Sequence, residues 1–130
     1  MTIANPDRGE HEIELGGVVY RLRPSHEAIR AIERKTDRST LELYSMGNRG
    51  ALSLDHLGVI FGELIRAGAA RDLDRHVHDE QIGALVYEGG QHKAMARATL
   101  VLIDAASGGR TASGEAKAAA TGTIETAGAA

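Results

Sequence analysis

The segment HVHDE, residues 76–80, gathers the side chains of this sequence that are best suited to bind a metal ion. His76 and His78 are two residues apart, so on a helix they point about 200° apart and share one side only in an extended segment. Two acidic residues follow, and His56 or His92 could complete a coordination shell. The spacing of zinc proteases, two histidines four apart with a glutamate between them, is absent. We therefore predict a solvated polar segment between two helices, with a metal site as the alternative.

Three serines are the candidates for a nucleophile, which would need a neighbouring base and an oxyanion donor. Ser25, Ser39 and Ser53 each precede a stretch of helical periodicity, where a serine caps the first turn, and no GxSxG motif is present. The paired carboxylates within residues 72–80 lie in a charged segment, without the apolar surroundings that raise the pKa of a catalytic acid. The chain has no cysteine. We expect no catalytic residue, no cofactor and no enzyme activity.

The composition indicates one small domain with an aliphatic core. The chain has 130 residues, of which 42% are hydrophobic and only 3% are aromatic. Such a core is built mainly from leucine, isoleucine, valine and alanine, and this composition favours packed helices.

Charge and hydropathy argue against two classes of partner. The net charge is −3, and acidic and basic residues are interspersed without a basic stripe that could neutralise phosphates. No apolar run approaches the roughly 20 residues that a membrane span needs. The N-terminal stretch MTIANPDRGEHE lacks the apolar segment of a secretory signal. We therefore expect a cytoplasmic protein that binds neither nucleic acid nor a membrane.

Two short runs around a Gly-Gly pair predict a β-hairpin at the start of the domain. In the first run, Glu12 and Glu14 alternate with Ile13 and Leu15, so one side is polar and the other apolar. The second run, VVYRL, is rich in the β-branched and aromatic residues that strands favour. Because an isolated hairpin is barely stable in water, we expect it to lie on the helices that follow.

Five helices are predicted after the hairpin, from capping residues and from apolar residues at helical spacing. The predicted helices span residues 25–36, 39–47, 53–68, 78–89 and 91–106. The clearest apolar stripe belongs to the third of them: Leu54, Leu57, Ile60, Phe61, Leu64 and Ile65. The run TLVLI in the last helix could also form a strand, but the alanines on both sides favour a helix.

The segment EGG at residues 88–90 interrupts what would otherwise be one long helix. Glycine adopts the left-handed conformation that ends many helices at low cost, so Gly89 or Gly90 can turn the chain into a tight corner. A phosphate-binding loop is disfavoured, because the remaining glycines, the lysine and the preceding strand are missing. We expect the apolar sides of the two helices to face each other: Ile82, Leu85 and Val86 against Met95, Ala98 and Leu102.

These features predict a mainly α fold, in which an N-terminal β-hairpin is followed by a compact bundle of about five short helices. We expect a single folded domain over residues 10–107, preceded by a flexible arm at residues 1–9. Residues 108–130 are rich in Ala, Gly and Thr, and Ile124 is their only large apolar residue. Because this stretch has no apolar face to dock, we expect a disordered C-terminal tail.

Three motifs, in a fixed order, carry a resemblance to a known family. They are AIERKT with Glu33, the helix LSLDHLGVIFGELIRAG, and EGG followed by an alanine-rich helix. In this order, from Glu12 to Ala106, the chain resembles the tail-assembly chaperones of gene transfer agents and of related siphophages and prophages. The long Ala/Gly/Thr tail and the histidine-rich segment depart from that family pattern and leave the role of the tail open.

The resemblance implies a non-enzymatic function during assembly of a phage-like tail in a bacterial host. Such chaperones are understood to hold the long tape-measure protein soluble until tail tube subunits polymerise around it, and then to leave. In many long-tailed phages the gene also yields a longer product by ribosomal frameshifting, and the Ala/Gly/Thr tail is the candidate point of divergence. The alternative function is a structural tail or head–tail component that is retained in the particle.

A chaperone must present apolar surface to its client. We predict two candidate partner-binding surfaces: the outer face of the hairpin, with Val18 and Tyr20, and the surplus apolar residues Leu100 and Val101 of the last helix. The alternatives are that these four side chains pack in the core, or that they form the self-association surface of a ring or dimer.

Overall fold

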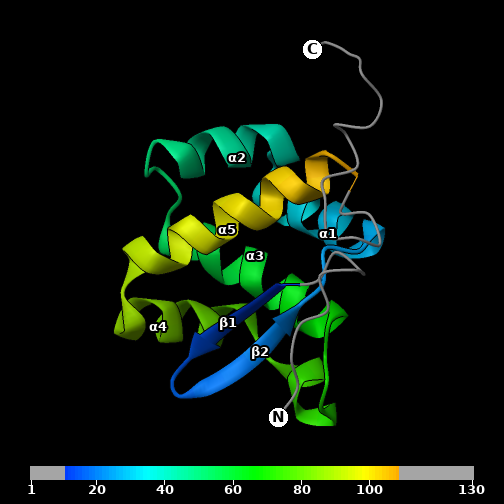
Figure 1. Cartoon of the computed structure of the whole chain (residues 1–130), viewed down its shortest axis with the longest axis vertical. Coiled ribbons are helices and arrows are strands. Elements are labelled where there is room, and N and C mark those ends of the chain that lie inside the picture. Colours follow the sequence, from blue (N-terminus) through cyan, green and yellow to red (C-terminus); the bar gives the residue numbers. More distant parts are fainter. Residues whose placement is uncertain (1–10, 109–130) are drawn as a thin grey trace.

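The computed structural model describes residues 11–108, which form a hairpin and five helices (Figure 1). The elements are β1 (His11–Leu15), β2 (Val18–Leu22), α1 (His26–Thr36), α2 (Thr40–Asn48), α3 (Leu54–Ala67), the short 3₁₀ helix η2 (Asp72–His76), α4 (Asp79–Gly89) and α5 (Gln91–Ala106). The predicted fold, mainly α with an N-terminal hairpin and five helices, is confirmed. The predicted arm lies outside the described residues, and so does the predicted tail except for Gly108.

The two strands are joined by the turn Gly16-Gly17, in which both glycines have positive φ angles, 60° and 80°. A two-residue turn of this kind matches the twist of the flanking strands, and it sets Leu15 opposite Val18 in the antiparallel pair. Leu15 lies on the face that packs against the helices and is 4% exposed, whereas Glu14 points to solvent. The alternation predicted for the first strand is therefore confirmed.

Three helices begin where the serines indicate. The hydroxyls of Ser25, Ser39 and Ser53 each accept a hydrogen bond from the backbone N–H three residues later, at 3.0–3.1 Å. His56 completes the cap of α3, because its Nδ1 accepts a hydrogen bond from the backbone N–H of Ser53 at 3.2 Å. Capping therefore accounts for all three serines.

The central helix of the fold is α3, which contacts β2, η2, α1, α4 and α5. Five side chains of its predicted apolar stripe are fully buried: Leu57, Ile60, Phe61, Leu64 and Ile65. The predicted corner is present, since α4 ends at Gly89, Gly90 has a φ of 102° and α5 begins at Gln91. The two helices do not, however, mainly face each other as we expected. Each packs chiefly against a helix earlier in the chain, α4 against α3 and α5 against α2.

Glycines bring α3 and α4 into close contact. A Cβ atom added at Gly58 would lie 2.6 Å from the backbone oxygen of Asp79 and 3.3 Å from the Cα atom of Gly83. One turn later, a Cβ atom added at Gly62 would collide with the Asp79 side chain. These neighbours show that the two helices run antiparallel, and any larger residue at Gly58 would have to displace the α4 backbone.

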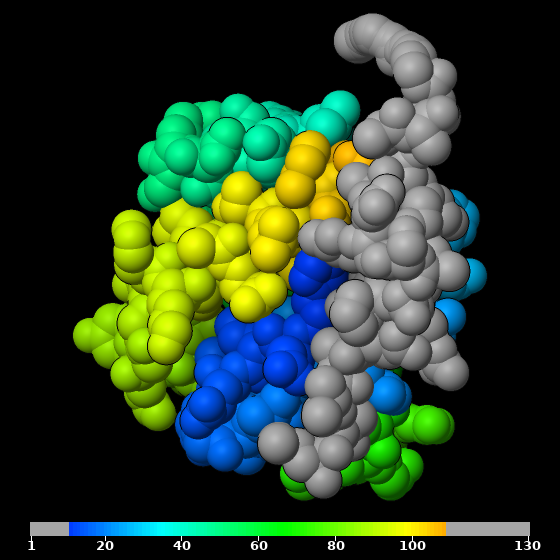
Figure 2. Space-filling model, viewed as in Figure 1, coloured from blue at the N-terminus to red at the C-terminus, as the bar shows by residue number. Residues whose placement is uncertain are grey.

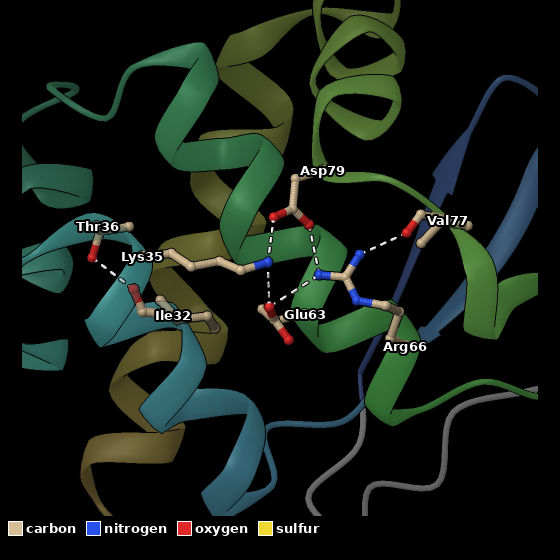
Figure 3. A network of polar contacts seen from close by, with 7 residues as sticks. All are labelled: Ile32, Lys35, Thr36, Glu63, Arg66, Val77 and Asp79. Carbon is tan, nitrogen blue, oxygen red and sulfur yellow. Dashed lines mark hydrogen bonds and ion pairs between the residues drawn. The ribbon is translucent and has the colours of Figure 1, made fainter.

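A closed polar network ties one end of this helix pair to α1 (Figure 3). Asp79 accepts hydrogen bonds from Lys35 Nζ at 2.7 Å and from Arg66 Nη2 at 2.6 Å. Glu63 pairs with the same two cations, at 2.7 and 3.1 Å. Arg66 also donates to the backbone oxygen of Val77 at 2.7 Å. Two carboxylates and two cations therefore connect three helices, with no charge of the four left without a partner.

The network raises the pKa of both cations. Burial by itself lowers the pKa of Lys35, but its hydrogen bonds and ion pairs with Asp79 and Glu63 outweigh burial and raise that pKa. The same balance raises the pKa of Arg66. The stability that Lys35 contributes is thus fully present below its ordinary pKa and is lost only as the pH rises above it.

Candidate functional site

Beside the contact of α3 and α4 lies an open hollow of about 510 Å³, which we call the α3–α4 groove and which Asp79 of the polar network also lines. Its apolar floor is formed by Leu54 and Val59 of α3 and by Ala84 and Tyr87 of α4. Gly83, which lies against Gly58, is also part of the lining. Because the two backbones approach through glycine, no large side chain fills the space above their contact, and the groove stays open.

Tyr87 is the largest side chain of this groove, and 65% of its surface is exposed. Tyrosine is among the residues that contribute most to binding energy at protein interfaces, because its ring is large, rigid and only partly polar. Tyr87 is therefore the candidate partner-binding side chain of this groove.

Four carboxylates line the α3–α4 groove, and one of them, Asp79, is paired with Lys35 and Arg66 in the polar network. The other three, those of Asp55, Glu80 and Glu88, form an acidic rim. Within residues 11–108 none of these three has an ion pair, and no lysine or arginine lines the groove. Asp55 and Glu80 lie in the first turns of their helices, where a negative charge is stabilising. Glu88 lies in the last turn of α4, where a negative charge is unfavourable, so helix stability does not account for it.

A second hollow, also about 510 Å³, lies between β1 and α5, which adjoin on the face seen in Figure 2. We call it the β1–α5 groove. Glu14 lines one wall, and Lys93, Arg97 and Leu100 line the other at helical spacing. Its charges are therefore of both signs, in contrast to the acidic rim of the α3–α4 groove.

Of the four residues predicted to bind a partner, only Leu100 is exposed, at 40%. Val101 is fully buried, because successive residues of a helix point roughly 100° apart and Val101 turns toward the core. Tyr20 is 8% exposed and Val18 is packed against the core. The hairpin register places both on the face that lies on the helices, so our assignment of Val18 and Tyr20 to the outer face is wrong. A binding role for Leu100 stays a prediction.

The HVHDE segment is divided between two elements. His76 ends η2 with its side chain 71% exposed, 3.8 Å from Asp72, and Asp79 begins α4 inside the polar network. Among residues 11–108, no three histidine or acidic side chains are grouped closely enough to hold a metal ion. The expectation that all carboxylates of this region are solvated is wrong for Asp74, which is 2% exposed and ion-paired with Arg71.

Sequence reasoning missed one buried polar pair. His11 Nε2 of β1 lies 2.9 Å from Asp104 Oδ2 of α5, and both side chains are nearly buried. The signal was available, because Asp104 is a negative charge in the last turns of a helix, where it needs local compensation. The pair fixes the start of β1 to the end of α5.

Sequence reasoning also missed Tyr87. The apolar residues that bury α4 are Ile82 and Val86, four residues apart, and Tyr87 follows one position off that stripe. An aromatic residue beside an apolar stripe, rather than on it, was the available signal for an exposed ring.

No family model, no curated protein and no solved structure matches this chain. None of the described helices is long and apolar enough to cross a membrane.

Proposed function

We propose that this protein is a non-enzymatic assembly chaperone of a phage-like tail, which binds the tape-measure protein and keeps it soluble while the tail tube is built. The ordered motifs of the sequence support this function. The main structural observation in its favour is the exposed apolar floor of the α3–α4 groove with Tyr87. A chaperone needs apolar surface that its own core leaves uncovered.

The proposed site of action is the cytoplasm of the bacterial host during particle assembly, with the tape-measure protein as client and tail tube protein as the component that displaces the chaperone. No cofactor takes part. The three serines cap helices, and Asp79 pairs with Lys35 and Arg66, so these four candidates for catalysis have structural partners.

The decisive experiment is co-expression with the longest helical tail protein encoded beside this gene. The pair is purified through a tag on this chain and analysed by size-exclusion chromatography with light scattering. We expect co-elution at a defined stoichiometry, with the client insoluble when it is expressed alone. A client that is equally soluble without this chain, and that does not co-elute, would rule out the chaperone function.

The second candidate function is a structural tail or head–tail component. The β1–α5 groove favours it, because an acidic strand facing a basic helix is self-complementary, as repeated contacts between copies require. Mass spectrometry of purified particles separates the two functions: a chaperone is absent from finished particles, whereas a component is present in stoichiometric amount. The same measurement on the products of the native operon tests the frameshift, since a single C-terminus would exclude a longer product.

A further inference from the structure

We infer that the α3–α4 groove is the docking site of a basic amphipathic α-helix, and that the client is recognised through such a helix. The inference deepens the proposed function and rests on it only for the identity of the client. The chemistry of the occupant follows from the groove itself.

The shape of the groove suits a helix. Two antiparallel helices form its walls, and their glycine contact keeps its floor low. A third helix laid along such a pair inserts its own ridge of side chains into the space between the two, as in ordinary helix packing. Leu54, Val59, Ala84 and Tyr87 then meet an apolar stripe of the occupant.

The charge of the rim specifies what flanks that stripe. Asp55 stands on the α3 side, and Glu80 and Glu88 stand on the α4 side, so a helix in the groove has a carboxylate on both flanks. Lysine or arginine on both sides of the apolar stripe satisfies these carboxylates, whereas glutamate or aspartate is repelled. A second copy of this chain offering the same groove is excluded as occupant, because it would place carboxylates against carboxylates.

The spacing of the rim residues sets the register of the occupant. Glu80 and Glu88 are eight residues apart on one helix, or about 12 Å along its axis. A helix lying beside α4 reaches both with basic residues seven or eight positions apart. Its apolar residues fall between them, three or four positions from each, where they contact Tyr87 and Ala84.

The two kinds of contact have different consequences. Tyr87 buries a large surface when the helix docks, so it governs affinity. The three carboxylates remain at the solvent edge, where opposite charges govern specificity and the rate of association, and where salt weakens them.

The test uses the full chain and two synthetic helical peptides. Both have the same stripe of leucine and alanine; one carries lysine on both flanks, and the other carries glutamate at the same positions. Fluorescence anisotropy measures binding of each labelled peptide, and circular dichroism of the mixture measures helix formation. We expect the lysine peptide to bind as a helix, and its affinity to fall as the salt concentration rises from about 0.05 to about 0.5 M. Binding of the glutamate peptide should be about tenfold weaker or more.

Three variants locate the site. Tyr87→Ala should weaken the lysine peptide about tenfold or more, whereas Leu41→Ala, which removes a side chain that is 62% exposed on α2, should leave binding unchanged. The double variant Glu80→Lys with Glu88→Lys should no longer bind the lysine peptide and should bind the glutamate peptide instead. Because all these side chains are exposed, we expect each variant to keep the fold. Thermal unfolding of each variant checks this.

The inference is overturned if both peptides bind equally well, if Tyr87→Ala binds like the unaltered chain, or if the double variant does not exchange its peptide preference. These outcomes are separate from those of the co-expression experiment, because neither peptide derives from a tail protein. If the chain binds the lysine peptide but not the tape-measure protein, the inference about the groove stands and the proposed function is wrong.

Discussion

Two regions of the α3–α4 pair, the polar network and the acidic rim of the groove, use the same kinds of residue to opposite effect. In the network, Asp79 and Glu63 are neutralised by Lys35 and Arg66, and every charge lies within 3.1 Å of a partner. On the rim, Asp55, Glu80 and Glu88 have no ion pair in the described part of the chain, and Tyr87 of the same groove is exposed.

This difference separates residues that hold the fold from residues that are left available. A carboxylate that pairs with two cations stabilises the contact between helices, and its removal leaves those cations less well compensated. An unpaired carboxylate at a rim contributes little to folding, or opposes it, as Glu88 does at the end of α4. The comparison predicts which substitutions reduce stability and which reduce binding only.

The largest contrast of this kind is expected between neighbouring residues of α5. Val101→Asp places a carboxylate in the core and should lower the free energy of unfolding by about 4 kcal/mol or more, enough to unfold much of the protein. Leu100→Asp, one residue earlier and exposed, should change it by no more than about 0.5 kcal/mol. Urea unfolding followed by circular dichroism measures both, and similar losses in the two variants would contradict the burial of Val101.

The network itself is tested by Asp79→Ala with Glu88→Ala as its matched control. Removing Asp79 should lower the free energy of unfolding by about 2 kcal/mol, because two charge-assisted hydrogen bonds are lost while Glu63 still pairs with both cations. Removing Glu88 should raise stability by up to about 0.5 kcal/mol, because it relieves an unfavourable charge at the end of α4.

Thermal or urea unfolding of the two variants gives the comparison directly. Equal losses at Asp79 and Glu88 would mean that the paired and unpaired carboxylates of this helix pair do not differ in their contribution to folding.

The close contact of α3 and α4 is tested by Gly58→Ala. The added methyl group meets the α4 backbone, and overpacking of this kind costs about 1–3 kcal/mol, from which up to about 1 kcal/mol of helix propensity is recovered. Gly89→Ala is the control, because a Cβ atom there meets nothing within 4 Å. We expect a clear drop in melting temperature for Gly58→Ala and none for Gly89→Ala; a drop in both would point to helix ends rather than to the contact.

The smallest effect on stability is expected at Glu33, a carboxylate near the surface that accepts hydrogen bonds from Thr40. The hydroxyl and the backbone N–H of Thr40 both donate to it, each at 2.8 Å, and these hydrogen bonds lower the pKa of Glu33 below its usual 4.5. A lowered pKa means that the stabilisation is present above the ordinary value and is lost as the pH falls through the folded-state value.

Glu33→Gln should therefore lower the free energy of unfolding by about 1 kcal/mol or less near neutral pH. The difference in this free energy between the variant and the unaltered chain should become smaller under acid conditions. Urea unfolding at several pH values measures that difference. Thr40→Val, which removes the hydroxyl donor, should show the same trend, and a difference that stays constant with pH would contradict the role of the ionised carboxylate.

Much of the local structure could be predicted because its causes are local. A serine at position 25 or 53 caps the helix that follows it through an N–H only three residues away, and the Gly-Gly pair at 16–17 supplies the positive φ angles of a two-residue turn. The EGG corner has the same kind of cause, a glycine with a φ of 102° between two helices. None of these depends on distant parts of the chain.

The candidate site could not be predicted in the same way. The composition of β2 does not show which of its faces is buried, and the pairing of Tyr20 with Ile13 places Val18 and Tyr20 on the inner face. The tight corner before α5 does not make α5 the main partner of α4, because the glycines of α3 allow a closer approach. Both errors concern which surface meets which.

The positions where the helices and strands begin and end follow from local sequence, because capping, turn formation and apolar periodicity act over one or two turns. Which charges are paired and which apolar side chains stay exposed depends on how these elements pack. Asp79 and Glu80 are adjacent in the chain, yet one closes a network of three helices and the other stands open at a groove. The reason is geometric: ion pairing and burial depend on helices that are distant in sequence and brought together by the glycine contact of α3 with α4.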